Sequence, residues 1–307
     1  MATISKNPPL HASPPPVSRV GSIFDEILRL MQEERGESIA PVCKQCLDLG
    51  YVFIPNPDRT GDPGTYELCS CQRELCRCDG HPPFEYFDEE ANAMRPCPVR
   101  PVRLDLHKAR LALRSSGIPP RFQGKFLDGI DQRVQESDNL TDAVFYAVRM
   151  IARFQSRNRR GLYLHGDTGC GKTLLSCAIL NEIIRAHREP VRYAKISRDI
   201  LGKLRASFNP NSEIYGEGKA IEDELARVPA LVIDDFGVHR ETEWVNQVLY
   251  DLIDARYEND LLTIITSNEP MDTWKGVGGG RIYSRLREMC AEEHIKSPDY
   301  RLRNRDA

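Results

Sequence analysis

One segment constrains the fold of this 307-residue chain more than any other: a glycine-rich loop between a predicted strand and a predicted helix. The strand is the apolar run 161–165, the loop is GDTGCGKT at 166–173, and a helical pattern follows through Leu175, Ile179 and Ile183. This order matches the GxxxxGK[ST] loop in the strand–loop–helix context that it needs to bind phosphate. The glycines let backbone N–H groups point at phosphate oxygens, and the helix N-terminus adds partial positive charge.

We expect this loop to hold the phosphates of ATP, with Lys172 reaching the β- and γ-phosphates and Thr173 completing the coordination of Mg²⁺. The remaining loop residues are expected to contact the nucleotide mainly through their backbone: Gly166, Asp167, Thr168, Gly169, Cys170 and Gly171.

Two further predicted strands end in polar residues. The apolar run at 230–233 ends in Asp234 and Asp235, which places both carboxylates at the carboxyl edge of a parallel sheet, beside the phosphates. We expect Asp234 to hold Mg²⁺ through water and Asp235 to orient or deprotonate the attacking water. Asn268 follows the strand 262–266, where it either senses the γ-phosphate and positions water or is an ordinary turn residue.

The alternation of apolar strands with amphipathic helices from residue 121 onward predicts a three-layer αβα domain with a parallel sheet, the P-loop NTPase fold. Ahead of it, the capping-box sequence at Ser22 and Asp25 starts a predicted amphipathic helix, which packs either on the cysteine-rich module or on a partner. The expected parts are a disordered proline-rich tail (1–21), this helix (22–42), a cysteine-rich module (43–97), a linker (98–120) and the ATPase domain (121–307).

The cysteines predict a metal module, because seven of the ten lie before residue 100. Two pairs, Cys43-x-x-Cys46 and Cys69-x-Cys71, are spaced for a hairpin that forms a closed tetrahedral Cys₄ site for structural Zn²⁺. An iron–sulfur cluster is the main alternative. A second set has three open interpretations, namely another zinc site, exchange with the first set, or free thiols: Cys76, Cys78, His81 and Cys97.

Composition limits the partners and the compartment. The net charge of -3 provides no global attraction to nucleic acid, so DNA contact requires a local basic patch. Neither a membrane-length apolar run nor a secretory signal is found, which predicts a cytoplasmic protein without a membrane partner. The candidates for DNA contact comprise two basic groups and two aromatic residues: Lys195, Arg198, Lys203 and Arg205; Arg153, Arg157, Arg159 and Arg160; Tyr193 and Phe208.

The order of the short motifs resembles the DnaC/DnaI/IstB group of AAA+ ATPases, which are bacterial helicase loaders and transposition helpers. The resemblance spans about residues 106–301 and rests on several motifs in one order: GIPPRF at 117–122, the phosphate loop, VIDDFG at 232–237, Arg256-Tyr257, TSN at 266–268, RIYSRL at 281–286 and DYR at 299–301.

The resemblance implies further roles. Arg285 corresponds to an arginine finger that acts on the nucleotide of a neighbouring subunit, so the active site is complete only in an oligomer. Arg301 corresponds to an arginine that acts on the nucleotide of its own subunit. Some loaders of the group carry a zinc module of this kind, whereas IstB-type helpers generally do not.

The implied function is ATP-dependent delivery of a replicative helicase onto single-stranded DNA. One alternative is a transposition helper that assembles on DNA and recruits a transposase. Another is a nucleotide-switched adaptor with little hydrolysis, because Asp235 stands where many AAA+ ATPases have Glu.

Overall fold

The computed structural model describes residues 22–36, 41–56, 63–130, 138–156, 160–237 and 242–297. The predicted proline-rich tail and Arg301 lie outside these ranges.

Within the described residues, a five-stranded sheet in the order β6-β7-β8-β5-β9 forms the centre of the ATPase domain, and all neighbouring strands are parallel. This confirms the predicted fold class. The strands are β5 (Gly161–His165), β6 (Val191–Lys195), β7 (Ala230–Phe236), β8 (Leu262–Ser267) and β9 (Cys290–His294). Sequence analysis did not find β9, because its sequence CAEEH has no apolar run.

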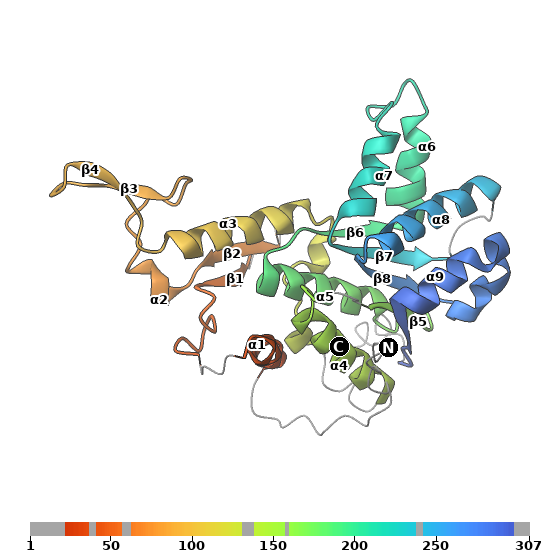
Figure 1. The fold of residues 1–307 in the computed structure, drawn as a ribbon, viewed down its shortest axis with the longest axis horizontal. Helices are drawn as coiled ribbons and strands as arrows, with labels where there is room; N and C mark the ends of the chain where they lie inside the picture. The colour runs from red at the N-terminus through yellow and green to blue at the C-terminus, as the bar shows by residue number, and fades with distance from the viewer. Residues whose placement is uncertain are drawn as a thin grey trace, which may run out of the picture.

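Helices cover both faces of this sheet (Figure 1). Alternate strand residues point to opposite faces, so Leu162 and Leu164 pack in one core cluster and Tyr163 in the other. The first cluster contains α4 (Asp138–Ala152) and α5 (Lys172–His187). The second contains residues of α8 (Glu243–Glu258), α9 (Arg281–Met289), α7 (Gly218–Arg227), η4 (Ile196–Gly202) and η5 (Met271–Gly280).

Two short segments complete the described part of this domain. The turn η1 (Pro120–Phe122) precedes α4, and α6 (Lys203–Ser207) follows η4. Helices α6 and α7 project together from the sheet (Figure 1). None of the helices in the described ranges combines the length and apolarity that a membrane span requires.

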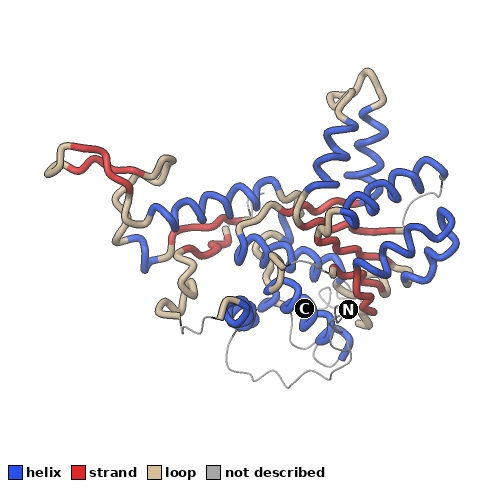
Figure 2. Tube along the Cα trace, viewed as in Figure 1, coloured by secondary structure: helices blue, strands red, loops and turns tan. Residues whose placement is uncertain are grey.

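The cysteine-rich part consists of two antiparallel hairpins and two helices. The first hairpin pairs β1 (Tyr51–Pro55) with β2 (Gly64–Leu68), and the second pairs β3 (Glu85–Asp88) with β4 (Ala93–Pro96). The short α2 (Ser70–Arg73) separates the hairpins, and α3 (Arg100–Ser115) follows them. The β3–β4 hairpin lies at the far end of the molecule from the parallel sheet (Figures 1 and 2).

Helix α3 joins this module to the ATPase domain. It packs on β2 and α5, and it occupies most of the segment 98–120 that sequence analysis assigned to a linker. Pro101 lies in its first turn, where a missing N–H costs no hydrogen bond. Two tyrosine hydroxyls of the first hairpin also donate to backbone carbonyls of α5: Tyr51 to Arg185 (2.9 Å) and Tyr66 to Asn181 (3.5 Å).

Helix α1 (Ile23–Glu34) begins with the predicted capping box, in which Ser22 and Asp25 exchange hydrogen bonds. The helix packs mainly on α4 and on η2 (Leu127–Gly129). The expectation that α1 packs on the cysteine module was wrong. Its buried Phe24 lies under the guanidinium of Arg185, 3.5 Å from the ring centroid, so α1 belongs to the core of the ATPase domain.

The fully buried Arg256 connects α8 by hydrogen bonds to the end of α7 and to β8. Arg256 donates from Nε to the hydroxyl of Thr263 (2.9 Å). Its terminal nitrogens donate to three backbone carbonyls: Leu225 (2.7 Å), Val228 (2.9 Å) and Leu262 (2.6 Å). The family motif Arg256-Tyr257 therefore includes a residue with a structural role.

We expect Arg256→Ala to lower the free energy of unfolding by about 3 kcal/mol or more, because it leaves buried carbonyls without donors at a cost of about 1–3 kcal/mol each. Urea unfolding measures the change. The matched control is Arg227→Ala, whose side chain is 77% exposed and whose loss should cost less than about 0.5 kcal/mol. Equal losses in the two variants would contradict the assigned role of Arg256.

Candidate nucleotide-binding site and cysteine clusters

The glycine-rich loop joins the end of β5 to the start of α5, as predicted. Gly166, Gly169 and Gly171 have φ angles of 145°, 85° and 99°, which L side chains rarely adopt. A Cβ at Gly166 would also lie 2.3 Å from the carbonyl of Ile295. No side chain caps the N-terminus of α5, so the first N–H groups of the helix remain available to an anion.

The Lys172 side chain is almost fully buried within this loop. Its ammonium donates to the carbonyls of Gly166 (2.7 Å) and Asp167 (2.8 Å) and contacts the sulfur of Cys170 (3.6 Å). No carboxylate is among these partners in the described part of the chain. A buried positive charge beside free helix N–H groups fits a polyphosphate, which would supply the missing negative charge.

Asp234 is fully buried at the end of β7 and accepts three side-chain hydrogen bonds. Its Oδ1 accepts from the hydroxyls of Thr173 (2.9 Å) and Thr266 (2.7 Å), and its Oδ2 accepts from Tyr193 (2.5 Å). Burial and the negative charge of Asp234 raise the pKa of Tyr193, so the phenol stays protonated as a donor. Carboxylate and hydroxyl oxygens are hard ligands that suit Mg²⁺, which fits Thr173 and Asp234 as its holders.

Asp235 adopts a left-handed conformation with φ of 60°, at an irregularity in the pairing of β7 with β8. Its carboxylate is half exposed and lies 2.8 Å from the ammonium of Lys195, which is also 3.7 Å from Asp234. Its N–H donates to Thr266. A strained backbone of this kind needs support from its surroundings and often occurs at active sites. As a result, the Asp235 side chain is half exposed although the adjacent Asp234 is fully buried.

The other predicted residues are arranged as follows. Asn268 is exposed directly after Ser267, which pairs with His165 on one side and Phe236 on the other, so it lies between the two other strand ends of the site. Arg285 lies on α9, where its Nε is 2.7 Å from the carboxylate of Asp254 on α8. The structure therefore does not bring Arg285 to the phosphate loop of its own chain.

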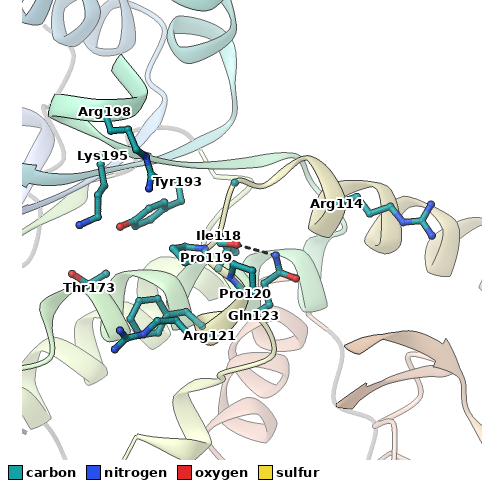
Figure 3. A pocket seen from close by; sticks show the side chains of 12 residues that line it. Arg114, Ile118, Pro119, Pro120, Arg121, Gln123, Thr173, Tyr193, Lys195 and Arg198 are labelled. Atoms are coloured by element: carbon teal, nitrogen blue, oxygen red, sulfur yellow. Dashed lines mark hydrogen bonds between the residues drawn. The ribbon is translucent and has the colours of Figure 1, made fainter. Parts of the chain in front are cut away.

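A cavity of about 430 Å³ adjoins Thr173. Figure 3 shows Thr173, Tyr193, Lys195 and Arg198 around the same space as the segment Ile118–Gln123, in which Gln123 donates to the carbonyl of Ile118 (2.8 Å). The basic side chains on its wall suit an anionic group next to Thr173.

Three residues of the site carry roles that sequence analysis missed. Tyr193, considered for base stacking, is only 2% exposed and donates to Asp234, so the stacking role is wrong. Lys195, considered for DNA contact, pairs with Asp235. Thr266 donates to the carboxylate of Asp234 and accepts a hydrogen bond from the backbone N–H of Asp235. Lys195 and Thr266 lie at strand ends, which was the available signal, whereas Tyr193 lies in the middle of β6.

The first predicted set of cysteines comes together. The sulfurs of Cys43, Cys46, Cys69 and Cys71 all lie within 4.8 Å of one another, because the β1–β2 hairpin joins the two pairs. The Cys43–Cys69 and Cys46–Cys71 sulfur distances are 3.9 and 3.6 Å. Zn–S bonds of about 2.3 Å in a tetrahedron separate the sulfurs by about 3.8 Å, so the thiols fit a zinc ion.

Hydrogen bonds to Cys43 and Cys46 favour the thiolate form that binds metal, whereas burial raises the pKa values of Cys46 and Cys71. The N–H of Gly50 donates to the sulfur of Cys46 (3.3 Å). Hydrogen bonds from the backbone and thiol of Cys46 and from the backbone of Gln45 lower the pKa of Cys43 to about 7. We therefore retain these four cysteines as the proposed zinc ligands.

A glycine-rich phosphate loop after β5, an acidic pair near the end of β7 and the sheet order β6-β7-β8-β5-β9 define a P-loop NTPase domain of the AAA+ class. Within that class the chain belongs to the IstB-like ATP binding proteins, whose family profile matches residues 128–307.

Three known proteins are similar to this chain in sequence or structure. The replicative helicase loader DnaI of Bacillus subtilis is 29% identical over 185 residues, which are 58% of this chain and 55% of DnaI. A protein of insertion sequence IS1162 from Pseudomonas fluorescens, described as ATP-binding, is 33% identical over 129 residues, 41% of this chain and 52% of its own length. A crystal structure of DnaI matches with a TM-score of 0.50 and 25% identity, covering 59% of this chain and 93% of that one. The chain thus spans little more than half the length of these two sequence relatives.

We expect Lys172→Ala to weaken ATP binding at least about tenfold, because a charge-assisted hydrogen bond contributes about 1.5–3 kcal/mol. Titration with a fluorescent ATP analogue measures the dissociation constant. Lys219→Ala is the matched control, since that side chain is 78% exposed on α7 and its variant should bind as the wild type does. Unchanged binding by Lys172→Ala would remove the phosphate-loop assignment.

Proposed function

We propose that this protein is an ATP-dependent loader that delivers a replicative helicase onto single-stranded DNA. The observation that carries the proposal is a module with four clustered cysteines docked through α3 onto a DnaI-like ATPase domain. The sequence similarity to the helicase loader DnaI supports the same function. Loaders with a zinc module of this kind belong to the group that the sequence resembles.

The proposed chemistry is hydrolysis of ATP. Lys172 and the N-terminus of α5 bind the phosphates, while Thr173 and Asp234 hold Mg²⁺, which neutralises phosphate charge when it is bound. Asp235 orients the attacking water, and Lys195 holds the Asp235 carboxylate by their 2.8 Å ion pair. Aspartate has a shorter side chain than glutamate, so we expect slow turnover.

Arg285 is proposed to act on the nucleotide of a neighbouring subunit. Two aromatic rings flank its guanidinium, which lies 5.2 Å from the ring centroid of Tyr257 and 6.0 Å from that of Tyr250. Together with the ion pair to Asp254, these contacts hold a partly exposed arginine on α9. A head-to-tail ring or helix of subunits would bring such a residue to the next phosphate loop. Self-association is therefore part of the proposed function.

Mixing two inactive variants tests this arrangement. We expect Arg285→Ala to lower the rate of ATP hydrolysis about 10³-fold or more and Lys172→Ala to abolish it. An equimolar mixture should recover hydrolysis at about one interface in four, since random mixing joins an intact loop to an intact finger at that frequency. Phosphate release measures the rate.

The control for the mixing test is Arg287→Ala, an exposed arginine on the same helix that should remain active alone. Failure to recover activity at any mixing ratio would contradict action in trans.

The helicase is proposed to bind the cysteine-rich module. Its second hairpin presents Phe87 and Met94, which are 55% and 59% exposed and directly opposite each other in the β3–β4 register. Leu75 on the adjoining segment is 56% exposed. Exposed apolar side chains grouped on one element are typical of a protein interface.

We expect the double variant Phe87→Ser, Met94→Ser to weaken the complex with the host replicative helicase at least about tenfold, because two apolar anchors are lost. Size-exclusion co-elution with ATP and with ADP, followed by titration calorimetry, measures the complex. Phe208→Ser is the control, because Phe208 is 69% exposed but follows α6 on the ATPase domain. Loss of the complex in the control alone would show that the helicase binds the ATPase domain and not the cysteine-rich module.

Two other functions can be distinguished from helicase loading by experiment. The similarity to the IS1162 protein supports a transposition helper, for which the wild-type chain would fail to bind helicase and would assemble on duplex DNA with ATP. The ion pair of Asp235 with Lys195 supports a nucleotide-switched adaptor, for which helicase binding would depend on ATP without measurable phosphate release.

A further inference from the structure

We propose that the chain binds a second zinc ion through Cys76, Cys78 and Cys97, with His81 as the fourth ligand. This site is separate from the Cys43, Cys46, Cys69 and Cys71 cluster and does not depend on the proposed function.

The sulfur geometry carries the proposal. The three sulfurs lie within 4.8 Å of one another, with Cys76 3.8 Å from Cys78 and 3.9 Å from Cys97. These separations agree with the sulfur–sulfur distance of about 3.8 Å around a tetrahedral zinc ion. They repeat the spacing in the first cluster, although the two clusters are built from different segments of the chain.

The surrounding groups are arranged to stabilise thiolates. The guanidinium of Arg103 donates to the sulfur of Cys76 from both Nε (3.3 Å) and Nη2 (3.0 Å). The N–H of Arg77 donates to the sulfur of Cys97 (3.3 Å). Three thiolates and one Zn²⁺ leave a net charge of -1, which the Arg103 cation offsets. Donors of this kind around the ligands are typical of built metal sites.

The second hairpin supplies an independent reason for a metal. No residue of β3 or β4 is buried, and the four residues of β4 are all exposed. A two-stranded hairpin whose strands bury no residue is marginally stable in water. Cys97 directly follows β4 in the short connection to α3, and Cys76 and Cys78 lie in the segment that leads to β3. A metal here would therefore hold both ends of the hairpin next to the start of α3.

The fourth ligand follows from the turn after Cys78. His81 stands three positions after Cys78, the same interval that separates Cys43 from Cys46, and Gly80 has a φ angle of 90° between them. The His81 ring is exposed and lies outside the sulfur cluster, so binding requires it to rotate toward the three sulfurs. Three cysteines and one histidine form a usual set of ligands for a structural zinc ion.

Metal analysis of the full chain tests the proposal. After desalting against a weak chelator, we expect two zinc ions per wild-type chain by inductively coupled plasma mass spectrometry. The double variant Cys76→Ser, Cys97→Ser should retain one, and so should the double variant Cys43→Ser, Cys46→Ser. Cys290→Ser is the matched control and should retain two, because Cys290 is remote from both clusters and its sulfur donates to the carbonyl of Thr263, as serine can.

Two results would overturn the second site: one zinc ion per wild-type chain, or no loss of zinc in Cys76→Ser, Cys97→Ser. Stoichiometric iron with visible absorption would overturn the assignment to zinc. His81→Asn should bind the second ion at least about tenfold more weakly in chelator competition, since it removes a ligand. Unchanged affinity would overturn the role of His81.

Cobalt substitution of the wild-type chain keeps the proposal testable if a cysteine variant does not fold. Co²⁺ at both sites should give sulfur-to-cobalt charge-transfer absorbance in proportion to seven thiolate bonds, whereas occupation of the first cluster alone gives four. Saturation of the absorbance at one equivalent of Co²⁺ would overturn the proposal.

Discussion

The buried carboxylate of Asp234 is the constraint on which the nucleotide site depends. An ionised carboxylate removed from water needs nearly all of its oxygen lone pairs satisfied. Here three hydroxyls from α5, β6 and β8 converge on it: Thr173, Tyr193 and Thr266. The same hydrogen bonds that stabilise the charge hold three elements of the domain in register. The arrangement also leaves Asp235, the next residue, to adopt a strained conformation near the surface.

The stability of the cysteine-rich module has two sources, namely its contacts with the ATPase domain and its clustered thiols. Tyr51 and Tyr66 donate to backbone carbonyls of α5, and α3 extends the core of the ATPase domain into the module. No residue of β3 or β4 is buried, so the β3–β4 hairpin has no core of its own. Small modules of this kind need an additional cross-link to fold stably. A metal ion bound by the clustered thiols would supply that cross-link.

Sequence analysis located the parts whose chemistry is local. The phosphate loop, the acidic pair and the apolar strands at 161–165, 230–233 and 262–266 were found because each depends on contiguous residues. Strand β9 was missed, since its pairing with β5 satisfies the backbone of a polar sequence that has no strand pattern. Helix α1 was predicted as a helix but placed against the wrong neighbour. Its amphipathic pattern shows that one face is buried and does not identify the surface that buries it.

The sequence by itself determined the class of fold, the phosphate-binding loop and the cysteines available to hold metal, because residue type and short spacing are sufficient for each. Only the tertiary structure decided how these residues are connected. It buried Tyr193 against Asp234, paired Lys195 with Asp235, and separated the N-terminal cysteines into one cluster of four and another of three in the described residues. The Tyr193–Asp234, Lys195–Asp235 and Cys76–Cys97 pairings join residues that are 21 to 41 positions apart in sequence. Strand order and helix packing set these partners, and short spacing does not encode them.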